Sequence, residues 1–87
     1  MISKRTKRFK QLFSALPKDV QTQANAAYRL FKRDPYHSGL FFKQVEIKPP
    51  LYSVRIGLHY RALGVKQGDT ILWVWIGSHA AYDKFLS

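Results

Sequence analysis

The longest uninterrupted apolar stretch, Ile-Leu-Trp-Val-Trp-Ile at residues 71–76, is the strongest constraint on the fold. Successive side chains of a strand point to opposite faces of a sheet, so a strand that is apolar at every position is covered on both faces. The stretch is also far too short to cross a bilayer as a helix. It therefore predicts an interior strand, central in a sheet, with Trp73 and Trp75 both in the core.

The second half of the chain contains the sequence patterns of several strands. Four segments have an alternating pattern or a β-branched and aromatic content: residues 41–47, 51–56, 60–66 and 70–76. Turns at residues 57–59 and 68–69 are short enough to join antiparallel neighbours. A further short strand is expected at residues 1–3.

The first half has the periodicity of helices. Apolar residues recur at helical spacing in two stripes, Phe9, Leu12, Phe13 and Leu16, then Val20, Ala24, Ala27 and Phe31. Pro17 separates the stripes, and the Asp34-Pro35 pair ends the second. We predict an αα-hairpin over about residues 4–33 and a short C-terminal helix with Ser78 as its N-cap. The fold class is therefore α+β, with the helical hairpin packed on an antiparallel sheet of about four strands.

Length and charge restrict the class of partner. The chain has 87 residues, so we expect residues 1–87 to form a single domain. Its 15 Lys and Arg against 5 Asp and Glu give a formal net charge of +10, which predicts a polyanionic partner. There is no cysteine, which excludes disulfides and thiolate metal sites. The N-terminus lacks the apolar region of a signal peptide, so we expect a cytoplasmic protein without membrane contact.

The register of the first hairpin places two arginines side by side. A three-residue turn at residues 57–59 pairs Arg55 with Arg61 and gathers the apolar residues of both strands on the opposite face. A two-residue turn would mix the faces. Because like charges directly opposite each other destabilise a sheet, the pattern predicts an anion between Arg55 and Arg61.

The second hairpin brings the C-terminal segment to the same end of the sheet. A two-residue turn at residues 68–69 places Arg61 opposite Ile76, close to His79. In a helical tail, His79 and Tyr82 are three residues apart and share one face. We therefore expect two guanidinium groups, an imidazole and a phenol around one pocket.

These four side chains suit the cleavage of RNA by attack of its own 2′-OH. Histidine supplies an acid or base that works near neutral pH, arginine stabilises the charged phosphorane, and tyrosine stacks on a base or donates a proton. A two-metal nuclease needs clustered carboxylates. The carboxylates of this chain are few and scattered: Asp19, Asp34, Glu46, Asp69 and Asp83. We therefore expect neither a metal nor another cofactor.

Each of these residues also has an interpretation without chemistry. A single histidine such as His79 is more often an ordinary surface residue, and Tyr82 equally suits an anchor for the tail. His37 and His59 are expected in turns. The basic residues near the N-terminus fit either a solvated helix face or a surface that holds phosphates without reading sequence: Lys4, Arg5, Lys7 and Arg8.

Two stretches resemble a known family: YSVRIGLHYRALG at residues 52–64 and ILWVWIGSHAAYDKFL at residues 71–86. They are similar to the RelE/ParE superfamily of toxins from bacterial type II toxin–antitoxin systems. The likeness is greatest to its HigB/RelE-like mRNA interferases, whose last strand commonly ends in Gly-Thr/Ser-His-x-x-Tyr-Asp. The resemblance extends over the helical hairpin and covers nearly the whole chain.

The resemblance implies a compact α+β toxin that enters the ribosome, cuts mRNA without a metal and so inhibits translation. It also implies neutralisation by a cognate antitoxin, with an acidic or amphipathic segment that binds the toxin. Two other functions stay open. One is a ParE-like toxin that inhibits DNA gyrase by binding alone, and the other is a non-toxic homologue that still binds nucleic acid.

The resemblance also implies roles for individual residues. Arg61 matches the phosphate-stabilising strand arginine of the family, and Arg55 matches the arginine that begins the same motif. His79 and Tyr82 fall in the C-terminal segment that usually holds the remaining catalytic groups. The basic residues that some members place around the scissile phosphate are matched, more loosely, by Lys43 and Lys48.

Overall fold

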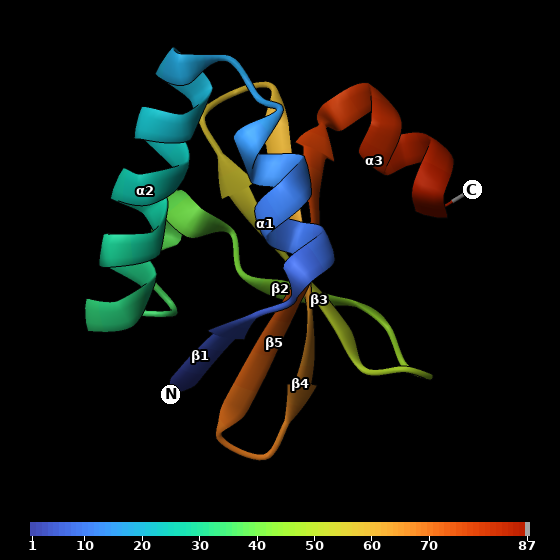
Figure 1. The fold of residues 1–87 in the computed structure, drawn as a ribbon. Coiled ribbons are helices and arrows are strands. Elements are labelled where there is room, and N and C mark those ends of the chain that lie inside the picture. Colours follow the sequence, from blue (N-terminus) through green and yellow to red (C-terminus); the bar gives the residue numbers. More distant parts are fainter. Residues whose placement is uncertain (87) are drawn as a thin grey trace.

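The computed structural model describes residues 1–86, which fold into a sheet with helices on both of its sides (Figure 1). The elements follow one another as β1 (Ile2–Arg5), α1 (Lys7–Ser14), α2 (Lys18–Arg33), the 3₁₀ helix η1 (Ser38–Leu40), β2 (Lys43–Glu46), β3 (Leu51–Ile56), β4 (Tyr60–Gln67), β5 (Thr70–Ser78) and α3 (His79–Leu86). The strands lie in the order β1-β5-β4-β3-β2. The predicted α+β class is confirmed.

Strand β1 makes the sheet mixed and five-stranded, where the sequence predicts an antiparallel sheet of about four strands. It runs parallel to β5, with Ile2 opposite Thr70. The indole of Trp73 donates a hydrogen bond to the Ser3 hydroxyl at 2.9 Å. A short, mostly polar strand has little periodicity of its own, and its place comes from pairing with the edge of β5. With β1 in place β5 is interior, as predicted, although the middle strand is β4.

A β-bulge interrupts the pairing of β4 with β5. Trp73 pairs with Gly64 and Trp75 pairs with Leu63, so Val74 is an extra residue between them. Trp73 and Trp75 therefore point to opposite faces, and Trp73 is buried while Trp75 is only half-buried. The prediction that both tryptophans lie in the core is wrong for Trp75.

The same bulge changes the register at the far end of the hairpin. The turn at residues 68–69 forms as predicted, with Lys66 opposite Ile71. Beyond the bulge, however, Arg61 pairs with Gly77 and not with Ile76. In the first hairpin the predicted register is confirmed, and Arg55 lies directly opposite Arg61.

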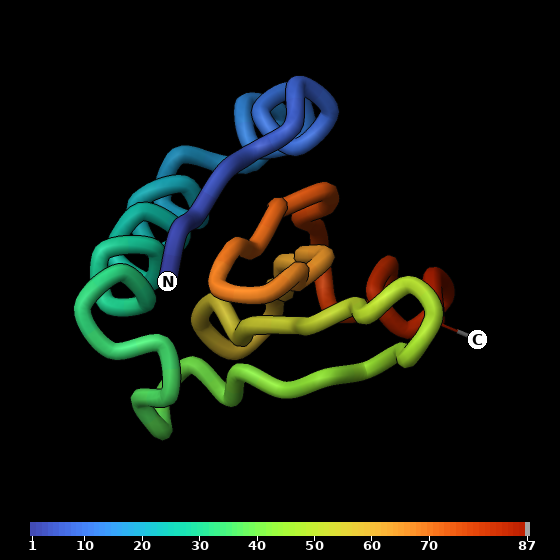
Figure 2. Tube along the Cα trace, turned by 90° about the horizontal axis from the view of Figure 1, so that it is seen from below, coloured from blue at the N-terminus to red at the C-terminus, as the bar shows by residue number. Residues whose placement is uncertain are grey.

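Helices α1 and α2 cover one face of the sheet, and α3 lies on its other side (Figures 1 and 2). The helices do not pack chiefly against each other, as a helical hairpin would, because α1 lies against β5 and α2 against β3. The Thr6 hydroxyl caps α1 by accepting from Phe9 N at 3.0 Å. Ser78 begins α3 as predicted, since its hydroxyl accepts from Ala81 N at 3.1 Å. Within residues 1–86, no helix is long and apolar enough to cross a membrane.

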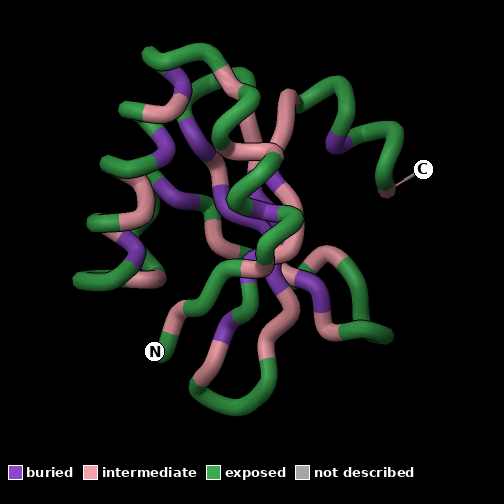
Figure 3. Tube along the Cα trace, in the orientation of Figure 1, coloured by how far each residue is buried: buried purple, intermediate pink, exposed green. Residues whose placement is uncertain are grey.

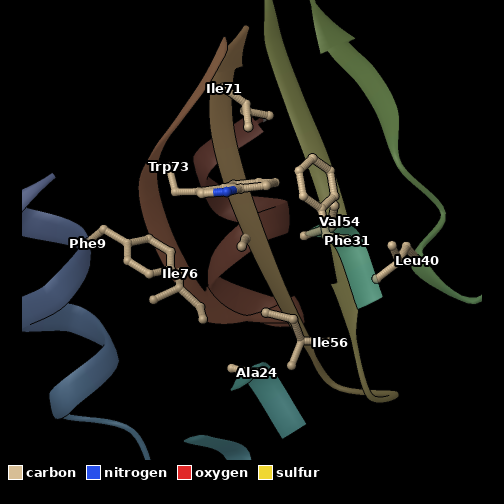
Figure 4. Close-up of a cluster of buried hydrophobic side chains, with 10 residues drawn as sticks. Phe9, Ala24, Phe31, Leu40, Val54, Ile56, Ile71, Trp73 and Ile76 are labelled. Atoms are coloured by element: carbon tan, nitrogen blue, oxygen red, sulfur yellow. The ribbon is translucent and has the colours of Figure 1, made fainter. Parts of the chain in front are cut away.

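The main core fills the space between α1, α2 and the sheet (Figures 3 and 4). Its buried members are Phe9, Ala24, Phe31, Leu40, Val54, Ile56, Ala62, Ile71, Trp73 and Ile76. The Phe31 ring meets the Trp73 ring edge-on at 5.2 Å between centroids. A smaller cluster on the opposite face joins Leu51 and Leu63 to Tyr82 of α3. This second cluster fixes α3 to the sheet.

Candidate active site

A cavity of about 210 Å³ lies on the side of the sheet opposite α1 and α2. Strands β3 and β4 contribute Ser53, Arg55 and Arg61, and α3 contributes His79 and Tyr82. The remaining side chains come from the segment that enters β2: Phe41 and Lys43. The cavity therefore brings together the four residues that the sequence predicts around one pocket, and adds a lysine to them.

Two arginines lie next to each other in this cavity. Arg55 and Arg61 face each other across β3 and β4, and the Arg61 guanidinium donates from Nη1 to the carbonyl of Tyr60 at 2.8 Å. Burial, and then the positive charge of Arg55, lower the pKa of Arg61, against a smaller opposing effect of Tyr82 and Asp83. Among residues 1–86 neither arginine forms an ion pair with a carboxylate. A bound anion would relieve this repulsion.

Arg55 has an unsatisfied donor. Its Nε is buried and has no hydrogen-bond partner within the described part of the chain. Its guanidinium lies 4.8 Å from the centroid of the Phe41 ring, so an aromatic face covers part of it. A buried donor without an acceptor destabilises the free protein. The Arg55 side chain also lines the cavity, where an acceptor-rich ligand such as a phosphate would bind a guanidinium.

Helix α3 places an imidazole at the side of the cavity. His79 Nδ1 lies 3.3 Å from an Asp83 carboxylate oxygen, at a spacing of four residues on the helix. The His79 side chain is 48% exposed, and Nε2 is the ring nitrogen left for a ligand. The Tyr82 ring lies 6.0 Å from the imidazole and is largely buried in the small cluster of the same face. Tyr82 therefore anchors α3 and borders the cavity at the same time.

The other predicted basic residues lie elsewhere. Lys48 follows β2 and lines a separate shallow hollow formed by residues 44–48. Arg5 lies on the side of α1 and α2, with its guanidinium 5.5 Å from the Tyr28 ring centroid. The remaining members of the N-terminal group are exposed on β1 and α1: Lys4, Lys7 and Arg8. Of the six basic residues predicted to contact RNA, the structure places one, Lys43, in the cavity.

Three residues at the site were not identified by sequence reasoning. Asp83 could have been found, because it follows His79 by one helical turn. Ser53 could also have been found, since it alternates with Arg55 on the same face of β3. Phe41 could not have been found, because the alternating pattern of residues 41–47 predicts a strand, whereas Phe41 adopts a left-handed conformation with a φ of 48°. Such a conformation costs on the order of 1 kcal/mol for a bulky side chain.

This arrangement can hold a phosphodiester and move a proton. Three cations, from Lys43, Arg55 and Arg61, line the cavity together with an imidazole. Across residues 1–86 there is no group of three or more His, Asp or Glu residues placed to hold a metal ion. The cations of the cavity can bind a phosphate, and its imidazole can accept or donate a proton.

Known proteins resemble the chain in sequence and in fold. The family model of the ParE-like toxin domain matches residues 18–84. A chain of the RelB–RelE antitoxin–toxin complex from Methanococcus jannaschii has a TM-score of 0.75 and 15% identity, and the match covers 97% of this chain and 99% of that one. A copper-bound mutant toxin from Helicobacter pylori has a TM-score of 0.61 and 16% identity, with 93% and 97% covered. No curated protein sequence matches.

Proposed function

The chain belongs to the ParE-like toxin domain family of the RelE/ParE superfamily, and from that premise we propose that this toxin is a metal-independent, ribosome-dependent mRNA endonuclease of the HigB/RelE type. One observation supports the proposal above all. Arg55, Arg61 and Lys43 line the same cavity as His79 and Tyr82. Cations for a phosphate and a group for proton transfer are thereby within reach of one ligand.

The proposed reaction uses the RNA's own 2′-OH as the nucleophile. The 2′ oxygen bonds to phosphorus and loses its proton to a base, while the bond from phosphorus to the 5′ oxygen breaks. The departing 5′ oxygen gains a proton from solvent water, which leaves a 2′,3′-cyclic phosphate and a 5′-OH end. Arg55 and Arg61 bind the non-bridging oxygens and stabilise the extra negative charge of the phosphorane.

His79 is the proposed proton-transfer group. The contact with Asp83 on Nδ1 favours the tautomer that carries its proton there, so that Nε2 accepts the proton of the 2′-OH. Asp83 is in this proposal a positioning residue, because it acts through the imidazole. Tyr82 fixes the helix that carries His79 and borders the cavity beside the imidazole.

We also propose two macromolecular partners besides mRNA. The chain has a net charge of +10, so its antitoxin would carry an acidic or amphipathic segment that covers the cationic cavity. The RelB–RelE complex supports an antitoxin partner, since it pairs a toxin of similar fold with an antitoxin. The exposed basic residues of β1 and α1 would contact ribosomal RNA without reading its sequence.

The experiment is a short induction of the chain in bacteria that lack its antitoxin, followed by mapping of new 5′ ends on translated messages. We expect cuts at fixed positions within codons, and a loss of at least about a hundredfold in the His79→Ala variant. His59→Ala is the matched control, because His59 lies in the nearby turn with an exposed side chain and does not line the cavity. Cleavage that survives in His79→Ala would contradict the assignment.

The family match also supports a second candidate, the inhibition of DNA gyrase by binding, since the matching model is that of ParE-like toxins. This activity needs no catalytic histidine. Growth arrest with uncut messages and a DNA-damage response, unchanged in His79→Ala, would favour it. Harmless expression at high level would instead favour a homologue that binds nucleic acid without toxicity.

A further inference from the structure

Phe41 lies at the edge of the cavity in a conformation that phenylalanine rarely adopts. Its φ is 48°, in the left-handed region, where it ends the 3₁₀ helix η1. Burial does not explain this strain, because the residue is 56% exposed. Residues held in sparsely populated backbone conformations cluster at active sites and ligand-binding sites.

Contacts in the cavity place this ring beside the two arginines. Phe41 precedes β2, whose first residue Lys43 pairs with Ser53, and its ring centroid lies 4.8 Å from the Arg55 guanidinium. Arg55 in turn pairs with Arg61 on the next strand. Phe41, Arg55 and Arg61 all line the same cavity. A phosphate bound between the arginines would therefore have the aromatic ring beside it.

We propose that Phe41 is the stacking platform for a nucleobase of the bound RNA, next to the phosphate that Arg55 and Arg61 hold. The inference rests on the proposed function, since it takes the ligand of the cavity to be RNA. Proteins bind unpaired RNA bases by stacking them on aromatic rings, and every base has a face that can stack. Arg55 packs on the ring at 4.8 Å, so the base, the ring and the guanidinium form one stack.

This platform also predicts a base preference. Stacking strengthens with the area of overlap, so a purine next to the bound phosphate binds more tightly than a pyrimidine. The other exposed aromatic residues of the described chain do not line the cavity. Tyr36 is 68% exposed, its ring contacts the Phe42 ring, and it does not line the cavity. It provides a matched control from the same region of the chain.

The test measures binding of a fluorescein-labelled hexaribonucleotide that carries 2′-O-methyl groups and so cannot be cleaved. Phe41→Ala should weaken binding about tenfold, whereas Phe41→Trp should retain it and Tyr36→Ala should leave it unchanged. Phe41→Asn separates strain from stacking, because asparagine tolerates the left-handed conformation. We expect Phe41→Asn to raise the melting temperature and to weaken RNA binding as much as Phe41→Ala.

An abasic nucleotide scanned along the oligonucleotide completes the test. At one position it should weaken binding by the full chain about tenfold, with no further loss when it is combined with Phe41→Ala. Two results would overturn the platform and leave the ribonuclease proposal intact. One is equal binding by wild type and Phe41→Ala, and the other is an abasic loss that has the same factor in both proteins at every position. Binding that depends on Phe41 without any cleavage of messages supports the platform and overturns the ribonuclease. Absence of binding of the free oligonucleotide by the wild type overturns the platform alone, because the proposed ribonuclease meets its message on the ribosome and is tested by the cleavage of translated messages.

Discussion

The two faces of the sheet are built from alternating residues of the same strands, yet they have opposite chemistry. Under α1 and α2, β3 contributes Val54 and Ile56, which are 5% and 3% exposed. On the other face the residue between them is Arg55, with a buried Nε that has no hydrogen-bond partner among residues 1–86. At this end of the sheet the face under α1 and α2, the closed face, is apolar, whereas the opposite face, the open face, carries Arg55 and Arg61 with no carboxylate paired to either among residues 1–86.

The difference shows how a chain of this size supports an unfavourable site. Each large apolar side chain buried under the helices contributes about 1.5–3 kcal/mol. The paired arginines on the opposite face destabilise the same two strands. Because the closed face holds the strands in register, the open face can keep two like charges next to each other. A residue's position along a strand therefore decides whether its substitution changes folding or ligand binding.

The largest expected effect tests the closed face. Trp73→Ala removes an indole that is 3% exposed and should lower the free energy of unfolding by about 3–5 kcal/mol. Trp75 is only half-buried on the open face and packs against Phe85, so Trp75→Ala should cost clearly less. Urea unfolding followed by far-UV circular dichroism measures both. Equal losses would mean that the two faces contribute equally to stability.

The next largest effect is a loss of RNA cleavage on substitution of Arg61 on the open face. Arg61→Gln should reduce RNA cleavage by roughly 10²–10³-fold, because it removes a donor to the phosphorane. Stability should stay the same or rise, since the change also removes the repulsion from Arg55. The control is Lys66→Gln, a cation on the same strand that faces the other way, with Nζ 5.9 Å from the Tyr52 ring centroid. A matching loss of activity in both variants would show a general charge effect, with no specific site.

The smallest expected effect is the difference in stability loss between alanine substitutions at two glycines, Gly64 and Gly77. A Cβ on Gly64 would lie 2.7 Å from Ile71 Cγ1, inside the main core, so Gly64→Ala should cost about 1–3 kcal/mol in the free energy of unfolding. On Gly77 the added atom would lie 2.5 Å from the Trp75 ring, which is half-buried and can shift toward solvent. Gly77→Ala should therefore cost less. Thermal melts of both variants measure the two losses. An equal or larger loss in Gly77→Ala would mean that the open face is packed as rigidly as the closed one.

Local patterns predicted much of the fold. Helical spacing identified α1 and α2, and the turn at residues 57–59 fixed the pairing of Arg55 with Arg61. The strand β1 was predicted only as a short segment, because its place depends on the parallel edge of β5 far along the chain. The bulge at Val74 could not be predicted either, since the short turn fixes the register only next to it; beside the bulge the side chains of Ile71 and Trp73 lie close to Gly64.

Short-range sequence patterns show which side chains are available for chemistry and which of them are neighbours within a hairpin or a helical turn. It therefore gives the pair Arg55 and Arg61, and the turn of helix that carries His79 with Asp83. The packing of the whole chain brings Lys43 and Phe41 to this group and leaves Lys48 outside it. Short turns and helical spacing act over a few residues, but the contact between segments depends on how the whole chain buries its apolar surface.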